Sequence, residues 1–334
     1  MKVLLTGGTG FLGKNVARRL AAAGHEVRLL ARASSNLSEL PPGVEIVRGD
    51  VVDAAAFAAA AQGCGAVVHM AALVKMWVPD ADEFDRVNVG GLRNALAAAR
   101  QAGARLVYTS SFIAVGPAGP EPVDESRVHD LKSFRNHYER TKALADVLAR
   151  EAAAAGQDVV ILYPGVVYGP GELTEANLVV KMVRDHLQGR LPALVGPGDR
   201  LWSYTFADDV AAAHVTALER GRAGERYFLC GENASLTDFF RRLEALTGVP
   251  APRRHIPFAV AALLGRALYL WAELTGAPPE LTQDVVAVFR EHWAYQSGKA
   301  ESELGYRCRP LADGLQKTVE WLRASQLVPA GPRA

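Results

Sequence analysis

Short apolar runs alternate with longer amphipathic stretches through the first half of the chain. The apolar runs predict strands at 2–5, 26–30, 44–48, 66–70, 105–109 and 159–163. The amphipathic stretches predict helices at 15–23, 54–61, 84–102 and 138–155. Strands that alternate with helices indicate a parallel sheet covered on both faces. The sequence therefore predicts an α/β fold, a Rossmann-type doubly wound parallel sheet.

The alternation loosens after residue 165. Helices are predicted at 177–188, 208–218, 237–247 and 258–275, short strands at 204–206 and 226–229, and a Gly/Pro-rich loop at 191–200. A chain of 334 residues exceeds the ~100–200 residues of a typical domain. We therefore expect a main domain at 1–165, rejoined by later strands near 204–230. Residues 166–330 would form most of a smaller, partly interleaved C-terminal lobe.

The segment 258–276 is apolar enough to raise the question of a membrane. Arg266 and Glu273 interrupt it and Pro257 precedes it, so a spanning helix fits poorly. We expect no stable membrane insertion and a buried or lid-forming amphipathic helix. Interfacial contact with lipid or with a lipophilic substrate stays open as the alternative.

Composition excludes some classes of partner. A net charge of +1, without a dense run of Lys or Arg, argues against nucleic acid. The three cysteines, Cys64, Cys230 and Cys308, lack metal-ligand spacing, so we expect no metal site. Buried reduced thiols suit a cytoplasmic protein.

A glycine-rich turn directly follows the first predicted strand. Gly7, Gly10 and Gly13 have the spacing G-x-x-G-x-x-G, and a helix and a second strand come next. Gly7 permits the tight turn, Gly10 lets the backbone approach a pyrophosphate, and Gly13 lets helix and strand pack closely. The alternative is a flexible turn. Because all the elements occur in the required order, the sequence predicts dinucleotide binding at 1–165.

Tyr138 and Lys142 give this turn a chemical meaning. Residues four apart share one face of a helix, so the phenol and the ammonium group can converge. A nearby cation lowers the pKa of a tyrosine, which would make Tyr138 a general acid/base near neutrality. Ser111 follows the fifth predicted strand, where its hydroxyl can donate to a substrate carbonyl. The alternatives are two helix-surface residues and a serine that caps backbone.

In a doubly wound sheet the ligand lies outside the carboxyl ends of the strands. Several residues directly follow predicted strands and should gather along this edge: Gly7 to Gly13, Asp50, Ala71, Ala72, Ser111 and Pro164. Lys142 is then placed both to tune Tyr138 and to hold the nicotinamide ribose.

With these motifs the chain resembles the extended short-chain dehydrogenase/reductases, the NAD-dependent epimerase/dehydratase family, over nearly its whole length. The motifs are TGGTGFLG at 6–13, GDV at 49–51, HMAA at 69–72, NVGG at 88–91, YTSS at 108–111, YERTK at 138–142 and YPGVVYGP at 163–170. The chain looks most similar to the branch of dihydroflavonol reductases, 3β-hydroxysteroid dehydrogenases and hopanoid-associated epimerase-like proteins, and especially to plant NAD-dependent farnesol dehydrogenases.

The resemblance implies catalytic roles for Ser111, Tyr138 and Lys142. It also implies that Asp50 lies near the adenine and that Asn88 belongs to the hydrogen-bond network of the active site. The full set of residues expected at the cofactor is Gly7, Gly10, Phe11, Leu12, Gly13, Arg32, Asp50, Val51, Ala71, Ala72, Tyr138, Lys142, Pro164 and Val167.

The end of the second strand bears on the choice of cofactor. A site that prefers NAD usually has an acidic residue there, to bind the ribose 2′-hydroxyl. The sequence instead continues Ala31-Arg32-Ala33-Ser34-Ser35, in which Arg32 can clamp a 2′-phosphate. The alternative is a solvated arginine, and the resemblance to farnesol dehydrogenases favours NAD. On balance the residues favour NADP.

The expected function is NAD(P)-dependent interconversion of an alcohol and its carbonyl. Trp202, Tyr204 and the apolar helix near Trp271 suggest a lipophilic substrate. One alternative is a nucleotide-sugar epimerase or dehydratase with tightly bound NAD, for which Arg190, Arg200, Arg253 and Arg254 are the candidate diphosphate ligands. Another is a non-catalytic dinucleotide-sensing protein.

The helices predicted at 84–102 and 138–155 are also candidates for a homodimer interface. Leu92, Leu96 and Ala99 form an apolar stripe on one, and Leu144, Val147 and Leu148 form another on the second. Each helix must bury one face on its own sheet, so a single stripe is as compatible with core as with interface. The Ala-rich flanks favour pairing.

Overall fold

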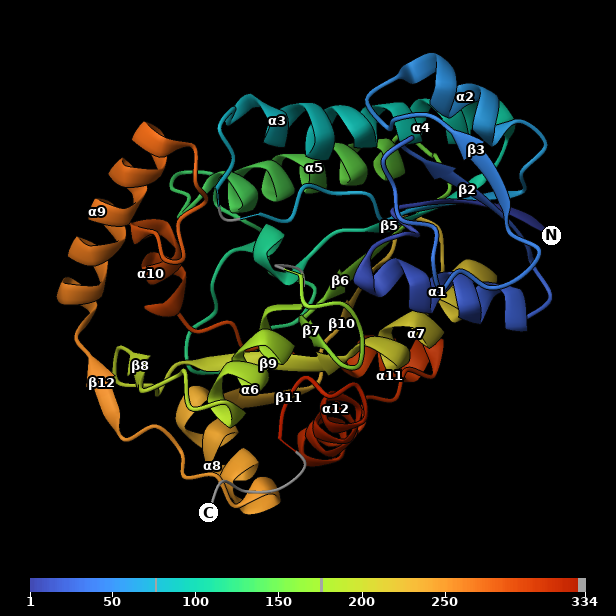
Figure 1. The fold of residues 1–334 in the computed structure, drawn as a ribbon. Coiled ribbons are helices and arrows are strands. Elements are labelled where there is room, and N and C mark those ends of the chain that lie inside the picture. Colours follow the sequence, from blue (N-terminus) through green and yellow to red (C-terminus); the bar gives the residue numbers. More distant parts are fainter. Residues whose placement is uncertain (76, 175–176, 330–334) are drawn as a thin grey trace.

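The computed structural model describes the whole chain except residues 76, 175–176 and 330–334 (Figure 1). Its centre is a seven-stranded parallel sheet in the order β10-β6-β5-β4-β1-β2-β3. The strands are β1 Lys2–Thr6, β2 Glu26–Ala31, β3 Glu45–Arg48, β4 Ala66–His69, β5 Arg105–Thr109, β6 Val159–Pro164 and β10 Arg226–Leu229. The strand order reverses direction at β1, which is the switch point of a doubly wound sheet. The predicted fold class is confirmed.

Helices cover both faces of this sheet, as Figure 1 shows. They are α1 Phe11–Ala22, α2 Ala54–Ala61, α4 Gly91–Ala102, α5 His137–Ala154, α7 Ala207–Arg220 and α11 Gly298–Leu304. Alternate residues of each strand enter two hydrophobic clusters. Leu4 packs in the cluster that contains α2, α4 and α5, whereas Val3 and Leu5 pack in the one that contains α1, α7 and α11. This alternation explains why the strands are apolar on both faces.

The long helix predicted at 84–102 is not regular. It begins as α3, Asp82–Phe84, continues as a π-helical turn at Asp85–Gly90, and becomes α-helical again in α4. A π-helical turn inside a helix frequently marks a functional position. Asn88 lies in this turn and is buried.

The later strands separate into three groups. β10 joins the main sheet beside β6. β7 Val166–Tyr168, β9 Leu201–Phe206 and β11 Glu232–Ser235 form a three-stranded sheet, so the strand expected at 204–206 does not return to the main one. Part of the predicted loop at 191–200 is a strand, β8 Ala193–Val195, because it pairs with β12 Arg254–Ile256 from a distant part of the chain. No local pattern reports such a pairing.

Five helices complete the C-terminal half. They are α6 Leu178–Leu187, α8 Leu236–Thr247, α9 Phe258–Thr275, α10 Gln283–Phe289 and α12 Leu311–Ala324. In Figure 1, α9 stands at the margin of the molecule beside α10. Cys64 and Cys230 are buried, Cys308 is partly exposed, and all three are free thiols.

The segment 258–275 is a helix as expected, but its expected burial is wrong, while a role as a lid stays a prediction. Only Ala261, Gly265 and Ala272 of α9 are buried, and most of its large apolar side chains face solvent. Among the described residues, α9 is the one helix with the length and hydropathy to cross a membrane. Hydropathy alone did not reveal its exposure, because burial depends on what packs against each face.

Candidate active site

The turn between β1 and α1 is built for close approach. Gly7 has φ +74°, and a Cβ on Gly13 would lie 2.1 Å from the carbonyl oxygen of Gly7. Helix α1 therefore begins almost directly after the strand. Its N-cap residue, Gly10, has no side chain to cap the first turn, so the helix presents the amides of Phe11 and Leu12 there. Such a helix start is suited to a pyrophosphate.

The hydroxyl of Thr6 fixes the neighbouring strand end. Its Oγ1 lies 2.8 Å from Nδ1 of His69 and accepts hydrogen bonds from the amides of Met70 at 3.3 Å and Ala71 at 3.2 Å. A Cβ on Gly7 would lie 2.7 Å from the Ala71 amide nitrogen. The structure thus brings Gly7 and Ala71, with Ala72 next in the chain, to one edge as predicted.

The ends of β2 and β3 also lie together. Ala31 pairs with Arg48, and Nη1 of Arg48 donates to the Arg32 carbonyl at 2.7 Å. Both guanidinium groups belong to exposed residues, and neither forms an ion pair within the described part of the chain. Two arginines, Arg32 and Arg48, therefore lie at the strand end where the sequence predicted only Arg32.

Asp50 and Val51 are engaged in the turn before α2. The Asp50 carboxylate accepts from the Val52 amide at 3.2 Å, and Asn94 donates to the Val51 carbonyl at 2.8 Å. The Val51 side chain is buried against Gly91 of α4. Both residues lie at the predicted edge of the sheet, but some of their hydrogen-bonding groups are already used within the protein.

Pro164 and Val167 bracket the crossing from the main sheet to the second one. Pro164 ends β6 and pairs with Leu229, while Val167 lies in β7 opposite Thr205. Val167 is half-buried in the same hydrophobic cluster as Leu12. Pro164 therefore lies at the strand edge as predicted, and Val167 lies in β7, the short strand that follows.

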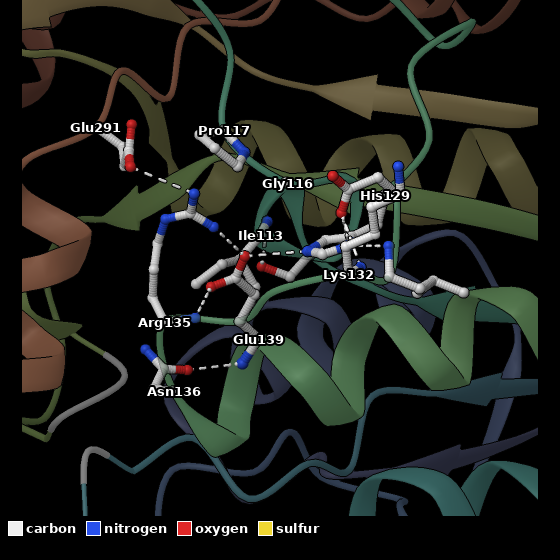
Figure 2. A network of polar contacts seen from close by, with 12 residues as sticks. Ile113, Gly116, Pro117, His129, Lys132, Arg135, Asn136, Glu139 and Glu291 are labelled. Atoms are coloured by element: carbon white, nitrogen blue, oxygen red, sulfur yellow. Dashed lines mark hydrogen bonds and ion pairs between the residues drawn. The ribbon is translucent and has the colours of Figure 1, made fainter.

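A buried charged network holds the first turn of α5, as Figure 2 shows. Glu139 is fully buried, and its carboxylate accepts from Nη1 of Arg135 at 2.6 Å, from the Arg135 amide at 2.8 Å and from Nε2 of His129 at 3.1 Å. The N-cap residue Asn136 accepts from the Glu139 amide at 2.7 Å. Our sequence interpretation missed Glu139, although Asn-x-x-Glu at 136–139 is the spacing of a capping box.

Lys142 lies one helical turn beyond Tyr138 and points to β5. Its Nζ donates to the Thr109 carbonyl at 3.0 Å and to the Tyr108 hydroxyl at 3.3 Å. Burial lowers the pKa of Lys142 to about 7, and the nearby Asp146 carboxylate opposes this shift. Asp146, another turn along α5, is itself buried and bonded to Tyr163 at 2.5 Å and Arg150 at 2.8 Å. Its role was also missed, although the i,i+4 spacing from Lys142 was readable.

The predicted lowering of the Tyr138 pKa is wrong for this structure. Burial raises the pKa of Tyr138 to about 12, and the hydrogen bond with Ser111 opposes this only in part. The Lys142 ammonium donates to Thr109 and Tyr108, so contacts to β5 replace the expected convergence with the phenol. Tyr138 is consequently protonated at neutral pH and can act as an acid.

Ser111 caps backbone, as the alternative considered for it predicts, and its role at a substrate carbonyl stays a prediction. Its Oγ accepts from the Ile113 amide at 3.4 Å, which caps the short 3₁₀ helix Phe112–Val115. Its hydroxyl also lies close enough to Tyr138 to oppose the rise in the pKa of that phenol. Asn88 accepts from the Leu73 amide at 2.7 Å and donates to Thr141 at 3.0 Å, which ties the segment after β4 to α5.

The three aromatic residues that suggested a lipophilic substrate differ in their surroundings. Trp202 and Tyr204 are buried in the core, and Trp271 is exposed on α9. The aromatic group beside Ser111 is instead Phe112, which packs edge-on against Trp293 with ring centroids 5.5 Å apart. The sequence did not reveal this contact because it joins segments 181 residues apart in the chain, between 112 and 293.

Of the four arginines considered as ligands of a nucleoside diphosphate, two contact other side chains and two are exposed. Arg190 pairs with Asp185 at 3.2 Å, and Arg200 bonds to His292 at 2.9 Å. Arg253 and Arg254 are exposed near α9. The described residues contain no group of three or more His, Cys, Asp or Glu side chains placed to hold a metal ion.

Two open hollows on the surface are not lined by Ser111, Tyr138 or Lys142, the triad of candidate catalytic residues. One of about 400 Å³ is lined by Asp124 and Lys299 among others, and one of about 530 Å³ by Glu232 and Arg309 among others. The candidate active site is instead the carboxyl edge of the main sheet, because the glycine turn after β1 and Ser111 after β5 lie along this edge and Tyr138 lies next to Ser111.

Comparison with known proteins identifies the family. Residues 3–230 match the family described as the NAD dependent epimerase/dehydratase family. A putative dihydroflavonol 4-reductase of Synechocystis is 34% identical, with 96% of this chain and 94% of that one covered. A 2-alkyl-3-oxoalkanoate reductase of Stenotrophomonas maltophilia is 34% identical, with 92% and 94% covered.

Solved structures share the whole architecture. The crystal structure of gox2253 has a TM-score of 0.84 at 31% identity and covers 98% of this chain and 99% of its own. DesIV of Streptomyces venezuelae, a dTDP-glucose 4,6-dehydratase solved with NAD bound, has a TM-score of 0.76 at 28% identity, with 98% of each chain covered. The glycine turn, the switch-point edge and these likenesses together make this chain a member of the NAD-dependent epimerase/dehydratase family, a family of NAD-dependent oxidoreductases and epimerases.

Proposed function

We propose that this protein is an NAD(P)-dependent reductase that interconverts a lipophilic ketone or aldehyde and its alcohol. The observation that carries the proposal is the position of Ser111 close enough to Tyr138 to act on its pKa, at the carboxyl edge of the sheet beside the buried Lys142. These are the groups that carbonyl reduction needs: a donor to the oxygen, a proton source and a cation.

The cofactor site fits a dinucleotide because the Gly10 N-cap leaves the first turn of α1 uncapped by any side chain. A bound nicotinamide cofactor would supply the hydride. Ser111 hydrogen-bonds the substrate oxygen, and Tyr138, protonated at neutral pH, gives that oxygen its proton. Lys142, held against β5 by Thr109 and Tyr108, supplies positive charge from the same side of α5 as the phenolate that forms.

Two observations support the choice of NADP as cofactor and of an apolar substrate. The exposed guanidinium groups of Arg32 and Arg48 favour NADP over NAD, since both can meet a 2′-phosphate. Phe112 beside Ser111 favours an apolar substrate. Relatives with names such as 2-alkyl-3-oxoalkanoate reductase and a farnesyl-dihydroquinoline-oxide ketoreductase point the same way. The engaged Arg190 and Arg200 count against a nucleotide sugar.

The test is to offer the protein a panel of long-chain ketones, isoprenoid aldehydes and flavonoid ketones. Turnover is measured as the change in nicotinamide absorbance, once with NADPH and once with NADH. Tyr138→Phe removes the transferable proton with little change in volume, so turnover should fall by ~10²–10⁴ while cofactor binding persists. Tyr269→Phe, at an exposed tyrosine of α9, is the matched control and should retain activity.

Near-normal turnover in Tyr138→Phe would remove the acid/base assignment. Purified protein that carries tightly bound NAD(H) and acts on nucleotide sugars would show an epimerase instead. Reversible cofactor binding without turnover on either class of substrate would leave a dinucleotide-sensing protein.

A further inference from the structure

Helix α9 exposes a continuous apolar surface. Its exposed large side chains are Val260, Leu263, Leu264, Tyr269, Leu270, Trp271 and Leu274, of which Leu263 is 72% and Leu274 82% accessible. The opposite side of the helix is tightly seated, since a Cβ on Gly265 would lie 2.6 Å from the Thr282 carbonyl carbon before α10. An apolar surface of this extent on a described helix marks a contact with something else.

The arrangement of charges on α9 leaves this surface uninterrupted. At about 100° per residue, the leucines at 263, 270 and 274 project opposite Gly265, together with Ala267, Val260 and Trp271. The two charged residues of the helix, Arg266 and Glu273, fall at one margin. Glu273 is engaged by Trp77, whose Nε1 donates to it at 2.9 Å.

Positive charge borders the apolar surface. Arg253, Arg254, Arg266 and Arg290 are all exposed, and none of them forms an ion pair within the described residues. The Arg290 guanidinium lies 5.4 Å from the centroid of the Phe258 ring, at the N-terminal end of α9. Leucines and a tryptophan bordered by arginines are the pattern of a helix that lies in the headgroup region of an anionic membrane.

We propose that α9 docks this protein on an anionic lipid surface, with the helix flat in the interface and α10 beneath it. Spanning the bilayer would require α9 to leave α10 and would carry Arg266 into the hydrocarbon. Flat docking keeps the packing of Ala261, Gly265 and Ala272 and places the arginines among phosphates.

A second copy of the chain is the rival occupant. Two copies of α9 packed together would bring the same exposed arginines, Arg253, Arg254 and Arg266, towards one another, whereas the phosphates of an anionic membrane would neutralise them. The charge around the helix therefore favours the membrane over a second copy. The docking inference does not depend on the proposed reaction.

The experiment is flotation of the full chain with vesicles of phosphatidylcholine alone or mixed equally with phosphatidylglycerol. The protein should float with the mixed vesicles, and less so as salt is raised. Leu263→Ser/Leu270→Ser/Leu274→Ser should weaken vesicle affinity by about 10²-fold or more. Arg253→Gln/Arg254→Gln/Arg266→Gln should weaken it by about fivefold per arginine on mixed vesicles only.

Val52→Ser/Leu246→Ser, at two exposed apolar positions away from α9, is the matched control and should float like the wild type. A blue shift of tryptophan emission on vesicle addition should disappear in Trp271→Phe. All variants should keep the melting temperature, because the positions are exposed.

The proposal is overturned if the wild-type protein floats with neither vesicle, or if the leucine triple variant floats as well as the wild type. It is replaced by self-association if the wild type does not float, scatters light as a dimer, and becomes a monomer in the leucine triple variant.

Discussion

Single side chains set both the charge at the active site and its response to pH. Tyr138 is a protonated acid because burial outweighs its hydrogen bond with Ser111, and Lys142 titrates near neutrality because it is buried with one opposing carboxylate nearby. Burial also lowers the pKa of His69, and the nearby Lys142 ammonium adds to this effect. The pKa of His69 falls to about 3. At this scale the environment of each group matters more than its identity.

Arg32 offers a direct test of the cofactor preference. Arg32→Asp removes a guanidinium that can bind a 2′-phosphate and adds a carboxylate that can bind a 2′-hydroxyl, so the preference should move from NADP to NAD by on the order of 1–3 kcal/mol. The measurement is the ratio of kcat/KM for the two cofactors, with Arg93→Asp on exposed α4 surface as the control. An unchanged ratio would mean that Arg32 is merely solvated.

His69 should make the protein acid-sensitive. The folded state resists protonation of His69 down to about pH 3, whereas the unfolded chain takes up this proton near pH 6.5. Stability is therefore lost as pH falls from about 6.5 to about 3, at up to ~1.4 kcal/mol per pH unit. His69→Asn should flatten this slope in denaturant unfolding across that range.

His137→Asn, at an exposed histidine, controls for the removal of a histidine as such. If the slope of the His69→Asn protein equals that of the wild type, another group governs the acid response. His214, buried with its pKa lowered to about 4, is the next candidate.

Helix α5 organises the triad at the scale of an element. Tyr138, Lys142 and Asp146 recur every fourth residue along it, which puts the acid, the cation and the buried carboxylate on one side. Its first turn is fixed by Glu139, which binds Arg135 and His129 from the preceding loop (Figure 2). The position of Tyr138 therefore depends on a network outside the triad.

Glu139→Gln should measure what that network contributes. The substitution keeps the shape of the side chain but removes the nearer and fully buried of the two anions that Arg135 pairs with, leaving Glu291 at 3.3 Å, so unfolding free energy should fall by about 2–3 kcal/mol. Glu151→Gln, at an exposed position on the same helix, should change it by less than about 0.5 kcal/mol. Equal effects of the two variants in urea unfolding would show that the network carries no special stability.

At the scale of the whole molecule, two surfaces are available for assembly. On the predicted dimer face, Leu92 and Ala99 prove to be fully buried in the core, which leaves Leu96, Leu144 and Val147 half-buried at the surface. The other surface is α9, for which we propose a membrane. The two functions are separable because they lie on different elements.

The homodimer through α4 and α5 stays a prediction. Light scattering at micromolar concentration should give twice 35.7 kDa, and Val147→Arg should return it to the monomer mass. The leucine triple variant of α9 should keep the wild-type mass. A wild-type mass near 35.7 kDa would mean that both apolar stripes serve the core.

The sequence by itself determined the features whose signals are local. Strand and helix alternation, the Gly7–Gly13 turn and the Tyr138–Lys142 spacing each lie within one segment, and period and propensity report them directly. The gathering of Gly7, Ala71 and Ser111 followed as well, since parallel strands end at a common edge.

Only the tertiary structure decided the rest. It assigned β9 to a second sheet, buried Trp202 and left Trp271 in solvent, and raised rather than lowered the pKa of Tyr138. Each of these outcomes depends on contacts between residues far apart in the chain, which set what is buried and what is charged. A local pattern specifies a side chain's chemistry and its face on an element, but its surroundings come from the packing of the other elements around it.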